Sequence, residues 1–306
     1  MSDSGCCQSA NCLSVTVKEC ISSIRRLGYS PKGKIAMTRN YGFVIDDNGK
    51  QIFIGDCSKH HLKKLKSFSK IESVAGTFSD EVGLTSHGDI VTSIKNEYSY
   101  NSKNTSFISL FEMMDEHQFD DFKDIVSISA GGCHIVGVKR DGTVVCWDSQ
   151  GGLEGAPDFR NIVKEWQCIK QVAVGYENII ALTNDGRVLG LDESFYTDYN
   201  DFIQVDAYGH YYGDCYSMAL RSNGRVMSPN FKEVSSWNDI VQIAVGWDVA
   251  LGLRRDGKVE VTSYGADVTE IVSSWHLVNL ECKFSHIIAI SEDCRIYCID
   301  IEKARR

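Results

Sequence analysis

Three short stretches hold residues whose types could do chemistry. His134 stands in the apolar stretch GGCHIVGV, where an imidazole could act as a general acid or base. Cys6, Cys7 and Cys12 in GCCQSANC offer thiolates to a metal, but they lack the two-residue spacing and second pair of a convincing zinc site. HHLKKLK at 60–66 offers paired histidines or a basic docking patch. We interpret the cysteine stretch as part of a disordered tail and the histidine stretch as a solvated connection.

A second group of residues suits recognition of another protein. The stretch 96–122, NEYSYNSKNTSFISLFEMMDEHQFDDF, places aromatic residues at helix-like spacing beside acids, and YGHYYGDCY at 208–216 is rich in tyrosine. Tyrosine and tryptophan anchor interfaces, and acids select a partner with a basic contact surface. The alternative is that 96–122 forms a helix packed on the flank of the fold and that the aromatics fill internal gaps. The predicted partner-binding residues are Phe107, Phe111, Glu112, Asp115, Tyr176, Glu177, His210, Tyr211, Tyr212, Asp214, Trp247 and Asp248.

Composition and missing motifs argue against several functions. The chain has 306 residues, 43% of them hydrophobic, so it can bury a large core. Its formal charge of -9 disfavours a nucleic-acid groove, which needs clustered lysine and arginine. It contains no Gly-rich phosphate loop, nucleophile elbow or paired histidines on a helix, so we predict no catalytic residue, cofactor or metal and no enzyme.

The sequence also bears on the compartment. The first thirty residues lack the basic region and long apolar run of a secretory signal, and no window is long and apolar enough to span a membrane. We therefore expect a cytoplasmic protein with reduced cysteines, which could still reach the nucleus or be delivered into another cell.

The stretch around His134 belongs to a repeated hairpin. Residues 131–148, GGCHIVGVKRDGTVVCWD, comprise an apolar strand, an Asp-Gly turn and a second apolar strand. Six further copies stand near residues 42, 81, 178, 216, 249 and 286, with 33 to 54 residues between successive turns. Self-similarity at this period is the signature of a repeat architecture.

The copies agree at the positions that matter physically. Apolar residues stand four and six positions before the turn, with a small residue such as Gly137 or Gly252 between them. We expect that small residue to lie where two backbones come close. Asp-Gly or Asn-Gly in most copies predicts a two-residue type I′ turn, in which both residues have positive φ.

A further apolar strand precedes most copies, as in IVSISAG at 125 and IKQVAVG at 169. Three strands per repeat of about forty residues, with little helical periodicity, predict an all-β, seven-bladed β-propeller over residues 12–306, preceded by a disordered tail at 1–11. The β-branched stretch CLSVTVKEC at 12–20 belongs to no complete repeat. We predict that it completes the last blade and closes the ring.

The repeat resembles that of the regulator of chromosome condensation family, from about residue 34 to 300. The resemblance rests on the aliphatic strand, the histidine turn, the Asp-Gly pair, TVVCWD and SQGGLEG, and it is best in the third copy. The family histidine is present here only as His134 and His286. The resemblance implies a seven-bladed propeller, and the best-known member of the family is a guanine-nucleotide exchange factor for the small GTPase Ran. No exchange-loop motif matches, so no family site is carried over.

The leading hypothesis is therefore a non-enzymatic interaction propeller, in its most specific form a guanine-nucleotide exchange factor for a small GTPase such as Ran. The second is a protein inhibitor of an enzyme or a scaffold that binds through its loop-rich face, since a secreted inhibitor of β-lactamases has a similar repeat length. The third is a propeller hydrolase or lyase, whose site would be assembled from loops of many blades.

Overall fold

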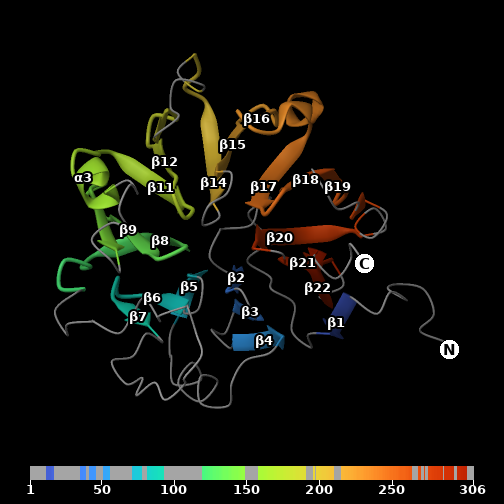
Figure 1. Cartoon of the computed structure of the whole chain (residues 1–306), viewed down its shortest axis with the longest axis horizontal. Coiled ribbons are helices and arrows are strands. Elements are labelled where there is room, and N and C mark those ends of the chain that lie inside the picture. Colours follow the sequence, from blue (N-terminus) through green and yellow to red (C-terminus); the bar gives the residue numbers. More distant parts are fainter. Residues whose placement is uncertain are drawn as a thin grey trace, which may run out of the picture.

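Seven antiparallel sheets are arranged around a central axis as the blades of a β-propeller (Figure 1). They confirm the predicted fold class. The structure is a computed structural model that describes residues 12–16, 35–38, 41–45, 51–55, 71–77, 81–92, 119–148, 158–190, 196, 198–209, 215–263, 268–269, 272, 275–284, 286–292 and 295–301.

Each blade contains three consecutive strands. The first three blades are β2 (Ile35–Met37), β3 (Tyr41–Ile45) and β4 (Gln51–Gly55); β5 (Ile71–Gly76), β6 (Glu81–Thr85) and β7 (Ile90–Thr92); and β8 (Ile125–Gly131), β9 (His134–Lys139) and β10 (Val144–Asp148). The next three are β11 (Ile169–Val174), β12 (Ile179–Thr183) and β13 (Val188–Gly190); β14 (Phe202–Gly209), β15 (Cys215–Arg221) and β16 (Val226–Met227); and β17 (Ile240–Gly246), β18 (Val249–Arg254) and β19 (Val259–Ser263). The seventh is β20 (Leu277–Lys283), β21 (His286–Ser291) and β22 (Arg295–Asp300). Two short helices, α3 (Phe159–Val163) and η2 (Lys232–Ser236), lie in connections between blades.

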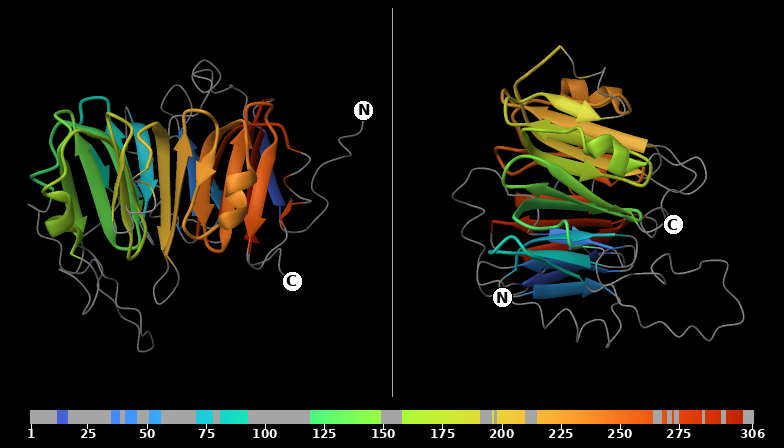
Figure 2. Two further views of the ribbon diagram at one scale, coloured as in Figure 1. Left: turned by 90° about the horizontal axis from the view of Figure 1, so that it is seen from above. Right: turned by 90° about the vertical axis from the view of Figure 1, so that its left-hand side faces the viewer.

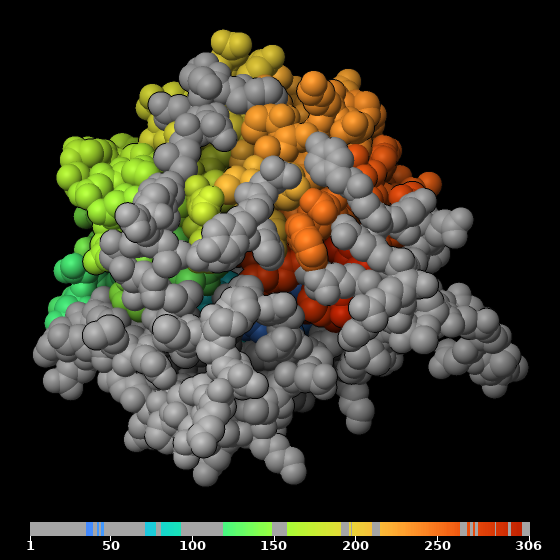
Figure 3. Space-filling model, viewed as in Figure 1, coloured from blue at the N-terminus to red at the C-terminus, as the bar shows by residue number. Residues whose placement is uncertain are grey.

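The first strand of every blade faces the central channel. Each of these strands contacts the first strand of the next blade, and β20 of the last blade contacts β2 of the first. In Figure 3, dark blue atoms of the first blade lie beside red atoms of the last. The ring is therefore closed by contact between its two end blades.

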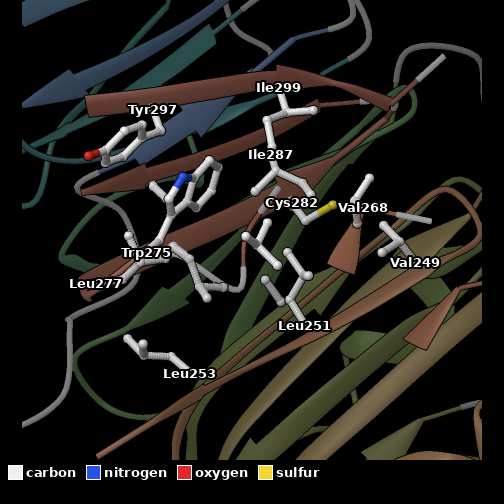
Figure 4. Close-up of a cluster of buried hydrophobic side chains, with 14 of the residues drawn as sticks. Val249, Leu251, Leu253, Val268, Trp275, Leu277, Cys282, Ile287, Tyr297 and Ile299 are labelled. Carbon is white, nitrogen blue, oxygen red and sulfur yellow. The ribbon is translucent and has the colours of Figure 1, made fainter. Parts of the chain in front are cut away.

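The hydrophobic core is divided into layers between neighbouring blades. One layer joins blades 6 and 7, where the rings of Trp275 and Tyr297 stack with centroids 4.7 Å apart (Figure 4). Another joins Met37 and Val44 of blade 1 to Ile288 of blade 7. Because every layer belongs to two blades, no blade can bury its apolar faces alone.

The strands run between two rims, seen edge-on in Figure 2. We call the rim with the glycine turns between second and third strands the turn rim. The opposite rim, where each first strand leads into the second, is the loop rim. Antiparallel pairing within each blade puts the two kinds of connection on opposite faces.

The glycine turns correct the predicted turn type. Gly142 has φ of +83°, but Asp141 does not have the positive φ that a type I′ turn requires. The Gly142 amide donates to the Lys139 carbonyl at 2.9 Å, and Asp141 Oδ1 accepts from the Thr143 amide at 2.9 Å. This pattern is typical of a type I turn followed by a left-handed glycine, and the aspartate is there to accept the hydrogen bond.

The same turns connect successive blades. The carbonyl of each turn glycine accepts a hydrogen bond from the first residue of the next blade, at N···O distances of 2.8 to 3.1 Å. The pairs are Gly88 with Ile125, Gly142 with Ile169, Gly186 with Phe202, Gly224 with Ile240 and Gly257 with Leu277. Each of these five acceptors is thus fixed against a buried apolar residue of its neighbour.

Glutamine side chains form a second connection between blades, halfway along the first strands. Gln204 donates to the carbonyl of Ile243 and accepts from its amide, at 2.9 and 3.0 Å. Gln171 forms the same pair of bonds with Val205, and Gln242 forms it with Leu280. Each bond contributes about 1 kcal/mol, and losing one partner while the other stays buried costs more.

The small residue in the second strands has a different neighbour from the one predicted. A Cβ at Gly137 would lie 2.9 Å from Ile125 Cδ1, and one at Gly252 would lie 2.8 Å from the Trp237 ring. The space is therefore taken by apolar side chains and not by a second backbone.

The N-terminal strand β1 (Cys12–Thr16) pairs antiparallel with β22, with Cys12 opposite Ile299 and Thr16 opposite Arg295. It makes the last sheet four-stranded. That this strand stabilises the closed ring stays a prediction, and the tail at 1–11 lies outside the described residues.

Deleting residues 1–20 is expected to lower the melting temperature of the whole protein, because β22 loses its outer partner and gains an exposed edge. Thermal unfolding of the truncated and full-length chains measures the effect. Deleting only residues 1–11 is the matched control and is expected to leave the melting temperature unchanged. Equal melting temperatures for all three chains would refute a role for β1 in closing the ring.

Candidate functional site

The side chain of His134 joins blade 3 to blade 4. Its Nε2 donates to the carbonyl of Tyr176 in blade 4 at 3.0 Å, its ring lies 4.5 Å from that of Phe159, and it is only 6% exposed. Its Nδ1 lies 3.7 Å from Asp148 Oδ2. Burial lowers the pKa of His134 below its usual range, although Asp148 opposes this shift. A buried, neutral imidazole bonded to a backbone carbonyl is structural, so the acid–base reading of GGCHIVGV is not supported.

At the equivalent positions of the next two blades, other side chains form a hydrogen bond to the following blade. Asn178 Nδ2 donates to the carbonyl of Tyr216 at 2.9 Å. The Tyr216 hydroxyl in turn donates to Asp248 Oδ1 at 2.6 Å. Blade 6 has Val249 at this position, which carries no side-chain donor, so the family histidine can be replaced here by another polar residue or by an apolar one.

Three of the predicted partner-binding residues on the loop rim are part of these contacts. Tyr176 is 8% exposed, with its ring 6.5 Å from that of His134, and Asp248 accepts from Tyr216. Trp247 is half-buried against the apolar layer between blades 5 and 6. The packing of Tyr176 and Trp247 agrees with the alternative that aromatics fill gaps between blades, and their use in binding a partner stays a prediction. Glu177 is half-buried and is in none of these bonds.

The other predicted residues lie outside the described part of the chain: Phe107, Phe111, Glu112, Asp115, His210, Tyr211, Tyr212 and Asp214. Only the end of the stretch 96–122 is described. There Phe119 packs on Trp147 with ring centroids 5.6 Å apart, and Phe122 is 5% exposed. This end of the stretch belongs to the core of blades 2 and 3.

Two cysteines in the strands are not suited to nucleophilic chemistry. Burial raises the pKa of the half-buried Cys146 to about 12, and that of the fully buried Cys282 is also raised by burial. Both thiols are therefore protonated at neutral pH, whereas the thiolate is the nucleophile and the metal ligand.

The central channel holds charged side chains beside small ones. A small cavity, partly open to solvent, is lined by residues of the first strands, among them Asp206, Glu281 and Lys283. Asp206 Oδ2 accepts from the Val245 amide at 2.9 Å, so it also connects two blades. Lys283 Nζ donates to the carbonyl of Ala130, which joins blade 7 to blade 3 across the channel.

The turn rim carries a feature that the sequence did not indicate. Among the described residues, the exposed large hydrophobic side chains are Val126, Tyr199 and Ile203, and all three stand at the turn-rim ends of blades 3 and 5. Arg221 lies 3.9 Å above the Tyr199 ring and donates to Asp201 at 2.8 Å. The residue types gave no signal for Val126 and Ile203, because both are aliphatic and stand directly beside a buried apolar residue.

The described residues show neither a group of three or more metal-ligating side chains nor a helix able to span a membrane.

Comparison with known proteins shows the fold. No family model matches the chain. The chain is similar to the CRINKLY WD40 ectodomain of the Arabidopsis thaliana receptor kinase ACR4, with 14% identity over 85% of this chain and 94% of that one and a TM-score of 0.58. It is also similar to Prp20p of Saccharomyces cerevisiae, whose structure was described with its binding to Gsp1p and histones (14% identity, 86% and 81% covered, TM-score 0.53). Human WBSCR16 gives 13% identity, 89% and 88% covered and a TM-score of 0.54. Prp20p is the yeast regulator of chromosome condensation, so the propeller is confirmed, while family membership stays a prediction.

Acidification is expected to destabilise the fold partly through His134. Because burial lowers its pKa, the unfolded chain takes up a proton that the folded chain does not as the pH falls through 6.5. The free energy of unfolding therefore rises with pH up to about this value. His134→Asn, which copies Asn178 of the next blade, removes this proton uptake. Urea unfolding at pH 5 and pH 7 should show that the free energy of unfolding falls less at pH 5 in the variant than in the original chain. An equal fall in both proteins would count against this role of His134.

Proposed function

We propose that the chain is a protein-binding propeller and not an enzyme. The observation that carries the proposal is the distribution of its side chains. His134, Asn178 and Asp248, at positions suited to chemistry, are used in bonds between blades. Among the described residues, in contrast, the exposed large hydrophobics all stand on the turn rim. Exposed aliphatic and aromatic side chains on a rigid rim are available for contact with another protein.

The most specific form of the proposal is regulation of a small GTPase, with Ran the first candidate. It is supported by the likeness in fold to Prp20p, which binds Gsp1p, and by the repeat pattern of the third blade. Exchange needs no covalent chemistry from the propeller. A rigid ring would bind the GTPase and displace its nucleotide by remodelling the loops around the phosphates.

Release of fluorescent GDP from Ran tests this form directly. The full chain at micromolar concentration is expected to accelerate release at least tenfold over the intrinsic rate. Glu177→Lys is the variant that tests whether the loop rim contacts the GTPase. Glu177 is chosen because it is in no described bond between blades, whereas changing Asp248 would break its bond to Tyr216. Unchanged release with Ran and with other small GTPases would rule out the exchange activity.

The broader proposal is tested with a partner that co-purifies from the native host. Partner and chain, each purified, should reform a stoichiometric complex on size-exclusion chromatography. A complex that ignores GDP and GTP would favour an inhibitor or scaffold over an exchange factor. Failure of every purified candidate to reform a complex would contradict the interaction function.

A further inference from the structure

The first strands carry an irregularity that forms a ring of side-chain positions. In blades 2 to 7 the pairing of first and second strands shifts after the first residue of the first strand, so that the second residue is a β-bulge. The first strands surround the channel, and all of them begin at the turn rim. The bulged positions therefore surround the turn-rim mouth of the channel: Glu72, Val126, Lys170, Ile203, Val241 and Val278.

Four consecutive bulge residues are exposed: the acid Glu72 of blade 2 and, in blades 3 to 5, two aliphatic residues with a cation between them. Val126 is 44% exposed and Ile203 is 47% exposed, while Lys170, also exposed, belongs to the blade between them. Val241 and Val278 of later blades are half-buried against the core layers. Blades 3 to 5 thus present an aliphatic residue, a cation and a second aliphatic residue in order around the mouth. We call Val126, Lys170 and Ile203 the mouth triad.

The charges around the triad leave its cation available. Lys170 forms no ion pair with any residue in the described part of the chain. Asp185, the acid nearest to it in electrostatic effect, already accepts from Arg187 at 2.9 Å and from the Thr183 hydroxyl. Partial burial lowers the pKa of Lys170, which Asp185 only partly offsets, so a carboxylate placed on this ammonium would be favoured.

Blade 5 extends the apolar part of the surface. Tyr199 is 38% exposed, stands four residues before Ile203, and packs against the buried ring of Phe202 with centroids 6.3 Å apart. Arg221 covers its other side and is itself neutralised by Asp201. The ring of Tyr199 is thus held between two neighbours, which lowers the entropic cost of using it in a contact.

We propose that the mouth triad binds a segment of a partner protein in which an acidic side chain stands between apolar ones. The carboxylate would pair with Lys170, and the apolar side chains would cover Val126 and Ile203, with Tyr199 at the edge. The inference rests on the proposed function and names the partner chemistry for this rim. It differs from the basic partner expected from sequence, which followed from loop-rim acids and the net charge of -9.

Labelled peptides provide the probe. Three synthetic peptides have Leu-Glu-Leu-Glu-Leu, Leu-Lys-Leu-Lys-Leu or Ser-Glu-Ser-Glu-Ser at the centre, and fluorescence anisotropy with the full chain measures their affinity. The first peptide is expected to bind at least fivefold more tightly than the other two, since it alone supplies both the apolar contacts and the charge. Equal affinities, or no binding of the first peptide, would overturn the proposal.

Matched variants then assign the contact to the triad. Lys170→Glu is expected to weaken binding of the Leu/Glu peptide at least fivefold and to favour binding of the Leu/Lys peptide. Ile203→Ser is expected to weaken binding of both leucine peptides at least threefold. Lys258→Glu makes the same charge change on the turn rim of blade 6. Its affinity for the peptides should stay within twofold of that of the original chain. Thermal unfolding confirms that each variant is folded. Unchanged peptide binding by Lys170→Glu would overturn the assignment.

The two proposals fail in different ways. If the native partner reforms its complex equally well with the original chain, Lys170→Glu and Ile203→Ser, the mouth triad is not its binding site, but the interaction function stands. If no partner complex forms with the original chain, the interaction function itself fails.

Discussion

The structure depends on a repeated hydrogen bond from the first amide of a blade to the turn glycine carbonyl of the blade before it. In all five described pairs the distance is 3.1 Å or less, although the turns stand 33 to 54 residues apart in sequence. The bond fixes where each first strand begins whatever the length of the connection. Most length differences are therefore absorbed between the third strand and the next first strand, apart from the longer connection between β14 and β15, and the blades stay in register around the ring.

This way of building the ring decides which polar residues are left for function. Glutamines at mid-strand, Asp206 in the channel and the chain from Asn178 through Tyr216 to Asp248 all bond from one blade to the next. Each of them looks reactive or recognisable in a sequence, yet its side chain already forms a hydrogen bond to another blade. Recognition is left to side chains that the ring does not need, and the clearest of these are the bulge residues at the turn-rim mouth, where pairing is interrupted.

The sequence predicted the architecture well and the surfaces poorly. Seven copies of one hairpin were enough to predict seven blades, because the apolar alternation is needed for packing in every copy. The turn type was predicted wrongly, since Asp-Gly suits two different turns and the φ of Asp141, which is not positive, distinguishes them. Tyr176 was assigned to the surface because its burial comes from the neighbouring blade. Val126 was missed because it is aliphatic and stands beside the buried Ile125, and the residue types carry no signal for the β-bulge at this position.

Native-state hydrogen exchange at the five linking amides is the most direct measurement of the claim that the ring is one unit held by bonds between blades. The account predicts that the amides of Ile125, Ile169, Phe202, Ile240 and Leu277 exchange only through global unfolding, with one common free energy and one denaturant dependence. Exchange of any one of them through local opening of its own blade, orders of magnitude faster than the rest, would contradict it.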